Sequence, residues 1–175
     1  MQSPKFIKSL AICLIALLAM FQIANGQAVQ SAASTTKVEL QAPLVIDGRE
    51  AEEIWINTGQ GRFRFTAEIA DEESERSIGL MHREKMAPTH GMLFKFETAR
   101  NIQMWMRNTP LSLDMIFINN SGEVMNIAER TTPFSDAIID SGKPVSFVLE
   151  INAGVTRLIG LKEGDKIDHR LFIKQ

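Results

Sequence analysis

The sequence predicts one mostly β (α+β) domain, a curled sheet or partly closed β-barrel with two short helices, behind an N-terminal export signal. Two observations carry this prediction. Beyond residue 37, short apolar or alternating stretches recur between turn residues, which is typical of strands rather than long helices. One of them, residues 113–118, is apolar on both faces. That favours a central strand covered on both sides over a flat open sheet.

The first 26 residues have the features of a secretory signal peptide. Two lysines precede an apolar run over residues 10–24, which is shorter than the ~20 residues that a membrane-spanning helix needs. Small residues permit cleavage after Gly26 or after Ala28. The alternative is an uncleaved N-terminal anchor. In either case we expect an exported domain, periplasmic or secreted.

Composition restricts the class of protein further. Cys13 is the only cysteine and lies inside the predicted signal, so we expect neither a disulfide nor thiol chemistry in the mature chain. Loss of the two signal lysines changes the formal net charge from −2 to −4. This acidic balance argues against a nucleic-acid partner and against strong binding to a membrane surface. Residues 27–37 are small and polar like a linker, and residues 38–175 have the size of one domain.

The first strands of the domain differ in the strength of their signals. Residues 38–46 form one plausible strand, and residues 54–56 are a weaker apolar patch. We interpret this part as an added edge strand or an embellishment. Residues 63–69 alternate cleanly, with aromatic and aliphatic residues on one side and Glu68 among the polar residues of the other. This pattern predicts a half-buried strand.

Two short helices are expected. Asp71 is placed to cap a helix that begins at Glu72 and ends or bends at Gly79. The second covers residues 153–159, with Asn152 as its cap. The further predicted strands cover residues 92–96, 102–108, 113–118, 124–128, 145–151 and 167–173, with a hairpin turn at residues 119–122.

The predicted strand at residues 102–108 carries the most distinctive side chains. Trp105 and Arg107 share one face, while Met104 and Met106 share the other. An indole beside a guanidinium can form the floor of a site for a sugar ring or planar ligand and clamp its anionic group. The same pair can equally be a surface cation–π contact with no further role.

Two carboxylates are expected among large aliphatic side chains. Asp114 alternates with isoleucines, and Glu150 neighbours Val148. A charge in such surroundings is costly unless it is paired, and Arg83 and Arg107 are the candidate partners. A structural salt-bridge network and a polar pocket that binds a ligand or moves protons both stay open.

Metal chemistry has one candidate. Met104 and Met106 with His82 or His90 would form a set that selects Cu(I) outside the cytoplasm. The methionines, however, alternate with apolar neighbours, which favours core packing. The chain lacks H-E-x-x-H, C-x-x-C, G-x-S-x-G and P-loop motifs, so we expect no resident metal or cofactor.

Several sequence blocks then identify a family. The blocks are E-R-S-I-G-L-M-H-R (residues 75–83), G-M-L-F-K-F (91–96), W-M-R-N-T (105–109), L-D-M-I-F-I (113–118), V-L-E-I-N-A-G (148–154) and G-L-K-E-G-D (160–165).

In order and spacing these blocks resemble domain of unknown function 192, an uncharacterised family of bacteria and archaea. The resemblance covers residues 63–175 and implies a small exported or membrane-tethered, mostly β domain, without implying an activity. The family commonly has lysine where Arg107 stands and proline where Ser112 stands. The residues that match its pattern, and that we expect to share a pocket, are Arg76, Gly79, Met81, Arg83, Gly91, Trp105, Asn108, Thr109, Asp114 and Glu150.

Three functional hypotheses follow. The leading one is a non-enzymatic module that binds a small ligand or a cell-envelope component. An alternative is a hydrolase with Asp114 and Glu150 as acid and base, which requires carboxylates about 5 to 10 Å apart. Another is a periplasmic Cu(I)-binding protein. The predicted ligand-binding residues are Arg76, Arg83, Trp105, Arg107, Asn108, Asp114 and Glu150.

Overall fold

The computed structural model describes residues 44–46 and 48–172. The predicted signal peptide and linker and most of the predicted strand at residues 38–46 therefore lie outside the described residues. In the described part, no helix is long and apolar enough to cross a membrane. The elements are β1 (Leu44–Ile46), β2 (Arg49–Thr58), β3 (Gly61–Ala70), α1 (Glu73–Ile78), β4 (His90–Arg100), β5 (Gln103–Met104), β6 (Leu113–Ile118), β7 (Val124–Ala128), β8 (Ile139–Asp140), β9 (Val145–Asn152), α2 (Val155–Leu158) and β10 (Lys166–Asp168).

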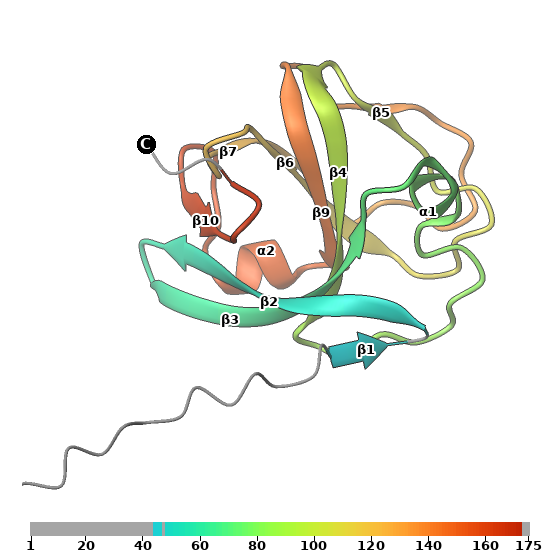
Figure 1. Ribbon diagram of the computed structural model, residues 1–175, viewed down its shortest axis with the longest axis horizontal. Coiled ribbons are helices and arrows are strands. Elements are labelled where there is room, and N and C mark those ends of the chain that lie inside the picture. Colours follow the sequence, from blue (N-terminus) through green and yellow to red (C-terminus); the bar gives the residue numbers. More distant parts are fainter. Residues whose placement is uncertain (1–43, 47, 173–175) are drawn as a thin grey trace, which may run out of the picture. The chain divides into compact units, whose positions relative to one another are not determined.

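One large sheet dominates the fold (Figure 1). Seven strands follow the order β1-β2-β3-β4-β9-β6-β7, and β10 pairs with β2. The β3–β4 pair is parallel and the other pairs of this sheet are antiparallel. β10 also contacts the β6–β7 hairpin. The Ile167 amide donates to the Gly122 carbonyl at 2.8 Å, and Glu123 forms an isolated antiparallel β-bridge with Lys166. The sheet thus curls until β10 links its two ends, which confirms the predicted partly closed barrel.

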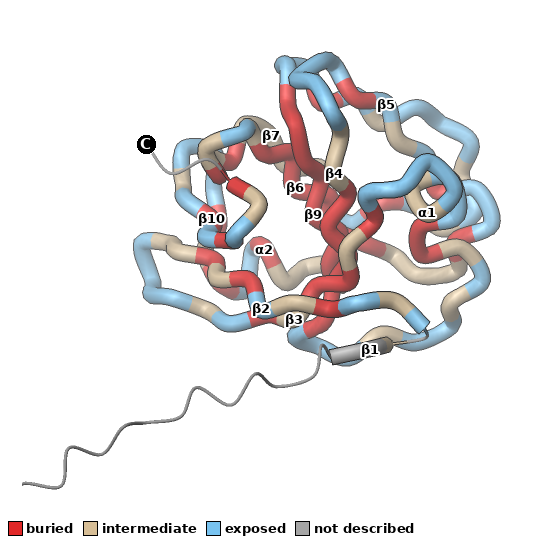
Figure 2. The backbone as a smooth tube through the Cα atoms, viewed as in Figure 1, coloured by how far each residue is buried: buried red, intermediate tan, exposed pale blue. Residues whose placement is uncertain are grey.

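The middle of this sheet is buried on both faces (Figure 2). All six residues of β6 are buried, as are the first seven residues of β9. One core cluster fills the inside of the barrel and includes Ile116 and Leu149. A second cluster lies on the outer face and includes Met115 and Val148. The prediction that the strand at residues 113–118 is central and covered on both sides is confirmed.

β2 is more than the edge or embellishment that its weak apolar patch suggested. It pairs with β3 through eight residue pairs and with β10 on its other side. Ile54 and Ile56 are fully buried in the inner core. The patch looked weak because charged residues of the same strand project outward. β3 matches its predicted strand, although Glu68 is buried rather than solvent-facing.

The predicted strand at residues 102–108 is wrong beyond its first residues. Only Gln103–Met104 pair in β5, and their partner β8 was not predicted. The chain turns soon afterwards because the Thr109 amide donates to the Met106 carbonyl at 3.1 Å and Asn108 adopts a φ of 55°. Side chains still alternate just beyond β5, since Trp105 is exposed and Met106 is buried.

Both helices exist, but their predicted caps are wrong. The cap of α1 is Glu72, which forms a capping box with Glu75, and Gly79 ends the helix as expected. The cap of α2 is Gly154, which adopts the left-handed conformation with a φ of 83°. Asn152 instead donates from its side-chain amide to the Ala87 carbonyl at 2.9 Å. Of the last predicted strand at residues 167–173, only residues 167 and 168 belong to a strand, β10, within the part that the structure describes.

Candidate functional site

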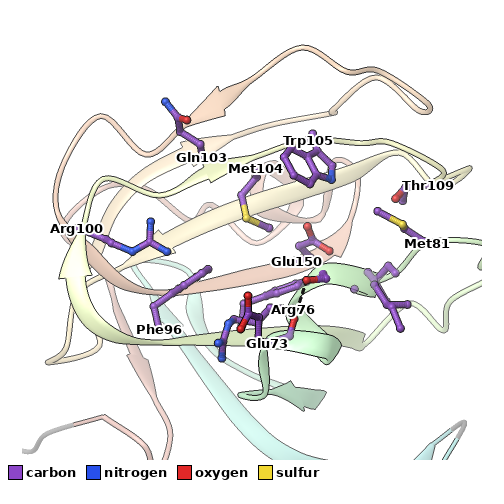
Figure 3. A pocket seen from close by; sticks show the side chains of 15 residues that line it. Glu73, Arg76, Met81, Phe96, Arg100, Gln103, Met104, Trp105, Thr109 and Glu150 are labelled. Atoms are coloured by element: carbon purple, nitrogen blue, oxygen red, sulfur yellow. Dashed lines mark hydrogen bonds between the residues drawn. The ribbon is translucent and has the colours of Figure 1, made fainter.

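A cavity of about 440 Å³ opens on the outer face of the sheet, between α1, β4 and the chain from β5 to residue 109 (Figure 3). Its volume falls within the range of small-molecule sites, ~300–1,000 Å³. The lining residues are Glu73, Arg76, Ser77, Ile78, Gly79, Leu80, Met81, Phe94, Phe96, Arg100, Gln103, Met104, Trp105, Thr109 and Glu150.

Glu150 is the one residue of β9 that lines this cavity. It lies opposite Met92 of β4 and Met115 of β6, so its side chain projects from the outer face of the sheet. Gly91 lets β4 approach here, since a Cβ atom at that position would lie 2.5 Å from the Glu150 carbonyl oxygen. The residue is only 4% exposed. Two neighbouring strands therefore fix the carboxyl group at the cavity.

Among the residues that the structure describes, no hydrogen bond or ion pair reaches the Glu150 carboxyl group, whose oxygens are accessible only through the cavity that it lines. Burial raises its pKa from 4.5 to about 8. No charged neighbour offsets this desolvation. The group therefore keeps its proton at neutral pH, where a carboxylic acid can donate a hydrogen bond to a ligand as well as accept one.

Aromatic and thioether groups form the apolar part of the site. Trp105 is 45% exposed and lies across the cavity from α1, near Met104 and Glu150 (Figure 3). Arg107 stacks on the Trp105 ring at 5.3 Å and forms an ion pair with Asp136, with 2.7 Å between Nε and Oδ1. Arg107 does not line the cavity, so its contact with the indole lies outside the site.

Two arginines lie at the end of the cavity near Phe96. Arg76 donates to the backbone carbonyl of Lys95 at 3.1 Å and to that of Asp71. Its guanidinium lies 5.8 Å from the Phe96 ring, and that of Arg100 lies 5.4 Å from the same ring. Neither arginine forms a salt bridge with a described residue. This end of the cavity therefore has cationic groups whose charge no carboxylate contacts directly.

Asp114 is not part of this site. It alternates with the inner-core residues Ile116 and Ile118, so it projects inside the barrel, on the opposite face from Glu150. Its carboxylate is fully buried and accepts hydrogen bonds from the Arg130 amide at 2.8 Å and from both the amide and the hydroxyl of Thr156. The expected arginine partners were wrong. Asp114 fastens α2 to β6.

Arg83 also lies elsewhere. It forms a bidentate pair with Glu68, with 2.6 Å between Nη2 and Oε2, and His90 contacts the same carboxylate at 2.8 Å. Burial alone would raise the pKa of Glu68, but hydrogen bonds from His90 and Arg83 hold it below the usual value. Arg49 lies 3.7 Å from the same carboxylate. These contacts describe a satisfied structural network.

Asn108 and most of the proposed copper ligands do not line the cavity. Asn108 does not line the cavity and donates weakly to the Met81 sulfur, 3.8 Å away. Of the proposed copper ligands only Met104 lines the cavity, while Met106 packs in the outer core and His90 binds Glu68. Within the described residues, no group of three or more histidine, cysteine or acidic side chains is placed to hold a metal ion.

Arg76, Trp105 and Glu150 are thus the predicted ligand-binding residues that the structure brings together. Sequence reasoning missed Phe96, Arg100 and Glu73 as lining residues. Phe96 and Arg100 lie on the far half of β4, where the alternation of apolar residues had faded. Glu73 falls within the predicted helix that begins at Glu72. No motif marked any of the three.

Comparison with known proteins identifies the family. The family model for domain of unknown function 192, described as "Uncharacterized ACR", matches residues 54–169. The chain belongs to this family. The match begins within β2, earlier than the resemblance at residues 63–175 suggested. A search of curated proteins found no match.

Two solved structures are similar to this chain along most of their own length. A Sinorhizobium meliloti protein, described as a candidate transcription regulator, is 45% identical, with a TM-score of 0.67 over 69% of this chain and 94% of that one. A Novosphingobium aromaticivorans protein of unknown function is 34% identical, with a TM-score of 0.71 over 75% and 95%. The family fold is thereby established without an activity.

Removal of the Glu150 carboxyl should change the pH dependence of stability. The unfolded chain loses this proton near pH 4.5, whereas the folded protein retains it until about pH 8. Stability therefore falls by roughly 1 kcal/mol per pH unit across that window. We expect Glu150→Gln to match the wild type near pH 4 and to exceed its free energy of unfolding by a few kcal/mol near pH 9, as measured by urea denaturation.

The matched control is Glu97→Gln, which changes an exposed glutamate on β4 and should leave the pH profile unchanged. A constant difference between Glu150→Gln and the wild type from pH 4 to 9 would contradict the raised pKa.

Proposed function

We propose that the protein is an exported, non-enzymatic binding module that takes a small ligand or a cell-envelope component into the cavity beside α1. The observation that carries this proposal is the unpartnered Glu150 carboxyl group at the cavity. Trp105 and Arg76 on opposite sides of it supply the aromatic surface and the cation that a bound molecule would contact. Small-molecule sites are usually mostly apolar pockets with a small number of convergent polar groups, and groups with shifted pKa values are common in them.

A structural role accounts poorly for Glu150. Acids that hold a fold together obtain partners, as Asp114 and Glu68 do. A buried carboxyl without one destabilises the folded state at neutral pH, where the unfolded chain gains by ionising. Groups with strongly shifted pKa values concentrate in functional sites. A hydrogen bond from Glu150 to a ligand would recover part of that free energy.

A binding role is favoured over acid/base hydrolysis because the two proposed carboxylates do not meet. Asp114 projects into the barrel with its hydrogen bonds occupied, whereas Glu150 projects from the outer face. The Cu(I) alternative also has little support, since the cavity contains Met81 and Met104 but neither histidine of the expected set.

Ligand capture should depend on Trp105. We expect at least one member of a panel of sugars, peptidoglycan fragments, organic acids and reduced copper to raise the melting temperature of the protein. A ligand at a hundred times its dissociation constant adds about 2.7 kcal/mol of stability. The shift should disappear in Trp105→Ala, because that change removes the wall of the cavity opposite α1.

Trp55→Ala is the matched control. Trp55 also stacks with an arginine, Arg62, at 4.2 Å, but it lies on β2 and does not line the cavity. Its loss should leave the ligand shift intact. Equal loss of the shift in both variants, or retention in both, would place binding away from this cavity.

Export is proposed from the N-terminal sequence. Expression of the full sequence in a bacterial host should yield a product outside the cytoplasm whose intact mass corresponds to a chain that begins at Gln27 or Val29. Cell fractionation followed by mass spectrometry checks both points. A full-length product in the cytoplasm would refute export.

A further inference from the structure

The chemistry of the cavity differs between its two ends (Figure 3). At one end Arg76 and Arg100 approach the ring of Phe96. Arg100 is exposed, and its side chain makes no hydrogen bond or ion pair with a described residue, so its guanidinium donors are available. Guanidinium groups recognise carboxylates and phosphates through paired hydrogen bonds. This end is therefore suited to an anion.

Glu73 limits the charge of that anion. It lines the same cavity from α1, beside Arg76 (Figure 3). Two guanidinium groups and one carboxylate leave a local balance of one positive charge. A singly charged carboxylate would neutralise it, whereas a dianionic phosphate monoester would overcompensate and meet Glu73 as a like charge. The balance favours a carboxylate ligand.

The opposite pole of the ligand is set by Glu150. Glu150 pairs with Met92 of β4, and Phe96 lies four residues further along the same strand. At about 3.3 Å per residue, the two levels are roughly 13 Å apart along the strand. Side chains reach inward from both levels, so the polar groups of a ligand must be somewhat closer than this. An extended eight-carbon chain provides such a separation.

The surface between the poles is mostly apolar. Phe94, Met104 and Trp105 line it, and the methionine can adapt its shape to a flexible chain. The protonated Glu150 carboxyl then faces the far end of the ligand, where it can donate to an oxygen or accept from a hydroxyl. An ammonium group would fit less well, because it would first require that carboxyl to ionise in a buried site.

We infer that the cavity binds an elongated monocarboxylate, with its carboxylate between Arg76 and Arg100, its apolar body along Phe94 and Met104, and an uncharged oxygen-bearing group at Glu150. The inference rests on the proposed function and names the ligand class of the same site. It requires both poles, so molecules that lack either one should bind more weakly.

Three matched probes test the inference by calorimetry at pH 6.5 on the protein expressed from its full sequence. These are 8-hydroxyoctanoate, which carries both polar groups, octanoate, which lacks the hydroxyl, and 1,8-octanediol, which lacks the carboxylate. One additional hydrogen bond corresponds to about fivefold in the dissociation constant. We expect the hydroxy acid to bind about fivefold or more tightly than each of the other two.

Two variants then assign the poles. Arg100→Gln should weaken binding of both acids about fivefold and leave the diol unchanged, while Arg157→Gln, an exposed arginine on α2, should change neither. Glu150→Leu should abolish the preference for the hydroxy acid over octanoate. That variant replaces an unpaired buried acid with an apolar group, so we expect it to fold.

The outcomes separate the inference from the proposed function. If the diol binds as tightly as the hydroxy acid, or if Arg100→Gln leaves the acids unaffected, the inference is wrong. A ligand shift that still disappears in Trp105→Ala would then retain the binding module with a different ligand class. If none of the three probes binds and no compound of the wider panel shifts the melting temperature, both are wrong.

Discussion

The structure depends on the burial of β9 and β6 on both of their faces. A strand covered on one side can place its ionisable residues in water, but β9 lies between β4 and β6 with a core on either side. Any acid on these strands must find partners or lose its charge. This constraint decides what Asp114 and Glu150 do. Asp114 finds hydrogen-bond partners, whereas Glu150 loses its charge.

The other buried acids among the described residues have hydrogen-bond or ion-pair partners. Asp114 accepts three hydrogen bonds that connect β6 to α2 and to the chain at Arg130, and so serves as a cross-brace inside the barrel. Glu68 is surrounded by Arg83, His90 and Arg49. Glu150 has none of these provisions and borders a cavity instead. Among the described buried acids, Glu150 thus differs from Asp114 and Glu68 in having no hydrogen-bond or ion-pair partner within the described part of the chain.

Much of the fold could be predicted from local patterns. The strand at residues 113–118 is recognisable because both of its faces are apolar. Residues 145–151 are mostly apolar as well, and the turn residues at 119–122 indicate the hairpin. β2 was underestimated because its charged outward residues masked Ile54 and Ile56. β5 and β8 pair through two residues each, which are too few to show the alternation of a strand in the sequence.

The site was harder to predict because its parts come from distant segments of the chain. The sequence marks Trp105, Arg76 and Glu150 as candidates, but it does not separate them from Arg83 and Asp114, which also lie in the blocks that match the family. The face of Asp114 followed from alternation with the isoleucines, yet its partners are mainly backbone amides, which no pattern reveals. The sequence predicts Glu68 on the polar face, yet it is buried, because alternation predicts a face and not what covers that face.

We infer that Glu150 retains its proton at neutral pH because it is buried beside the cavity without a partner among the described residues. The direct measurement is a carbon-13 NMR titration of the glutamate side-chain carboxyl carbons, with the Glu150 signal assigned by its absence from Glu150→Gln. We predict a titration midpoint near 8 for this signal, well above the usual value of 4.5. A midpoint near 4.5 would mean that water or an unrecognised partner satisfies the carboxylate, and would contradict the account.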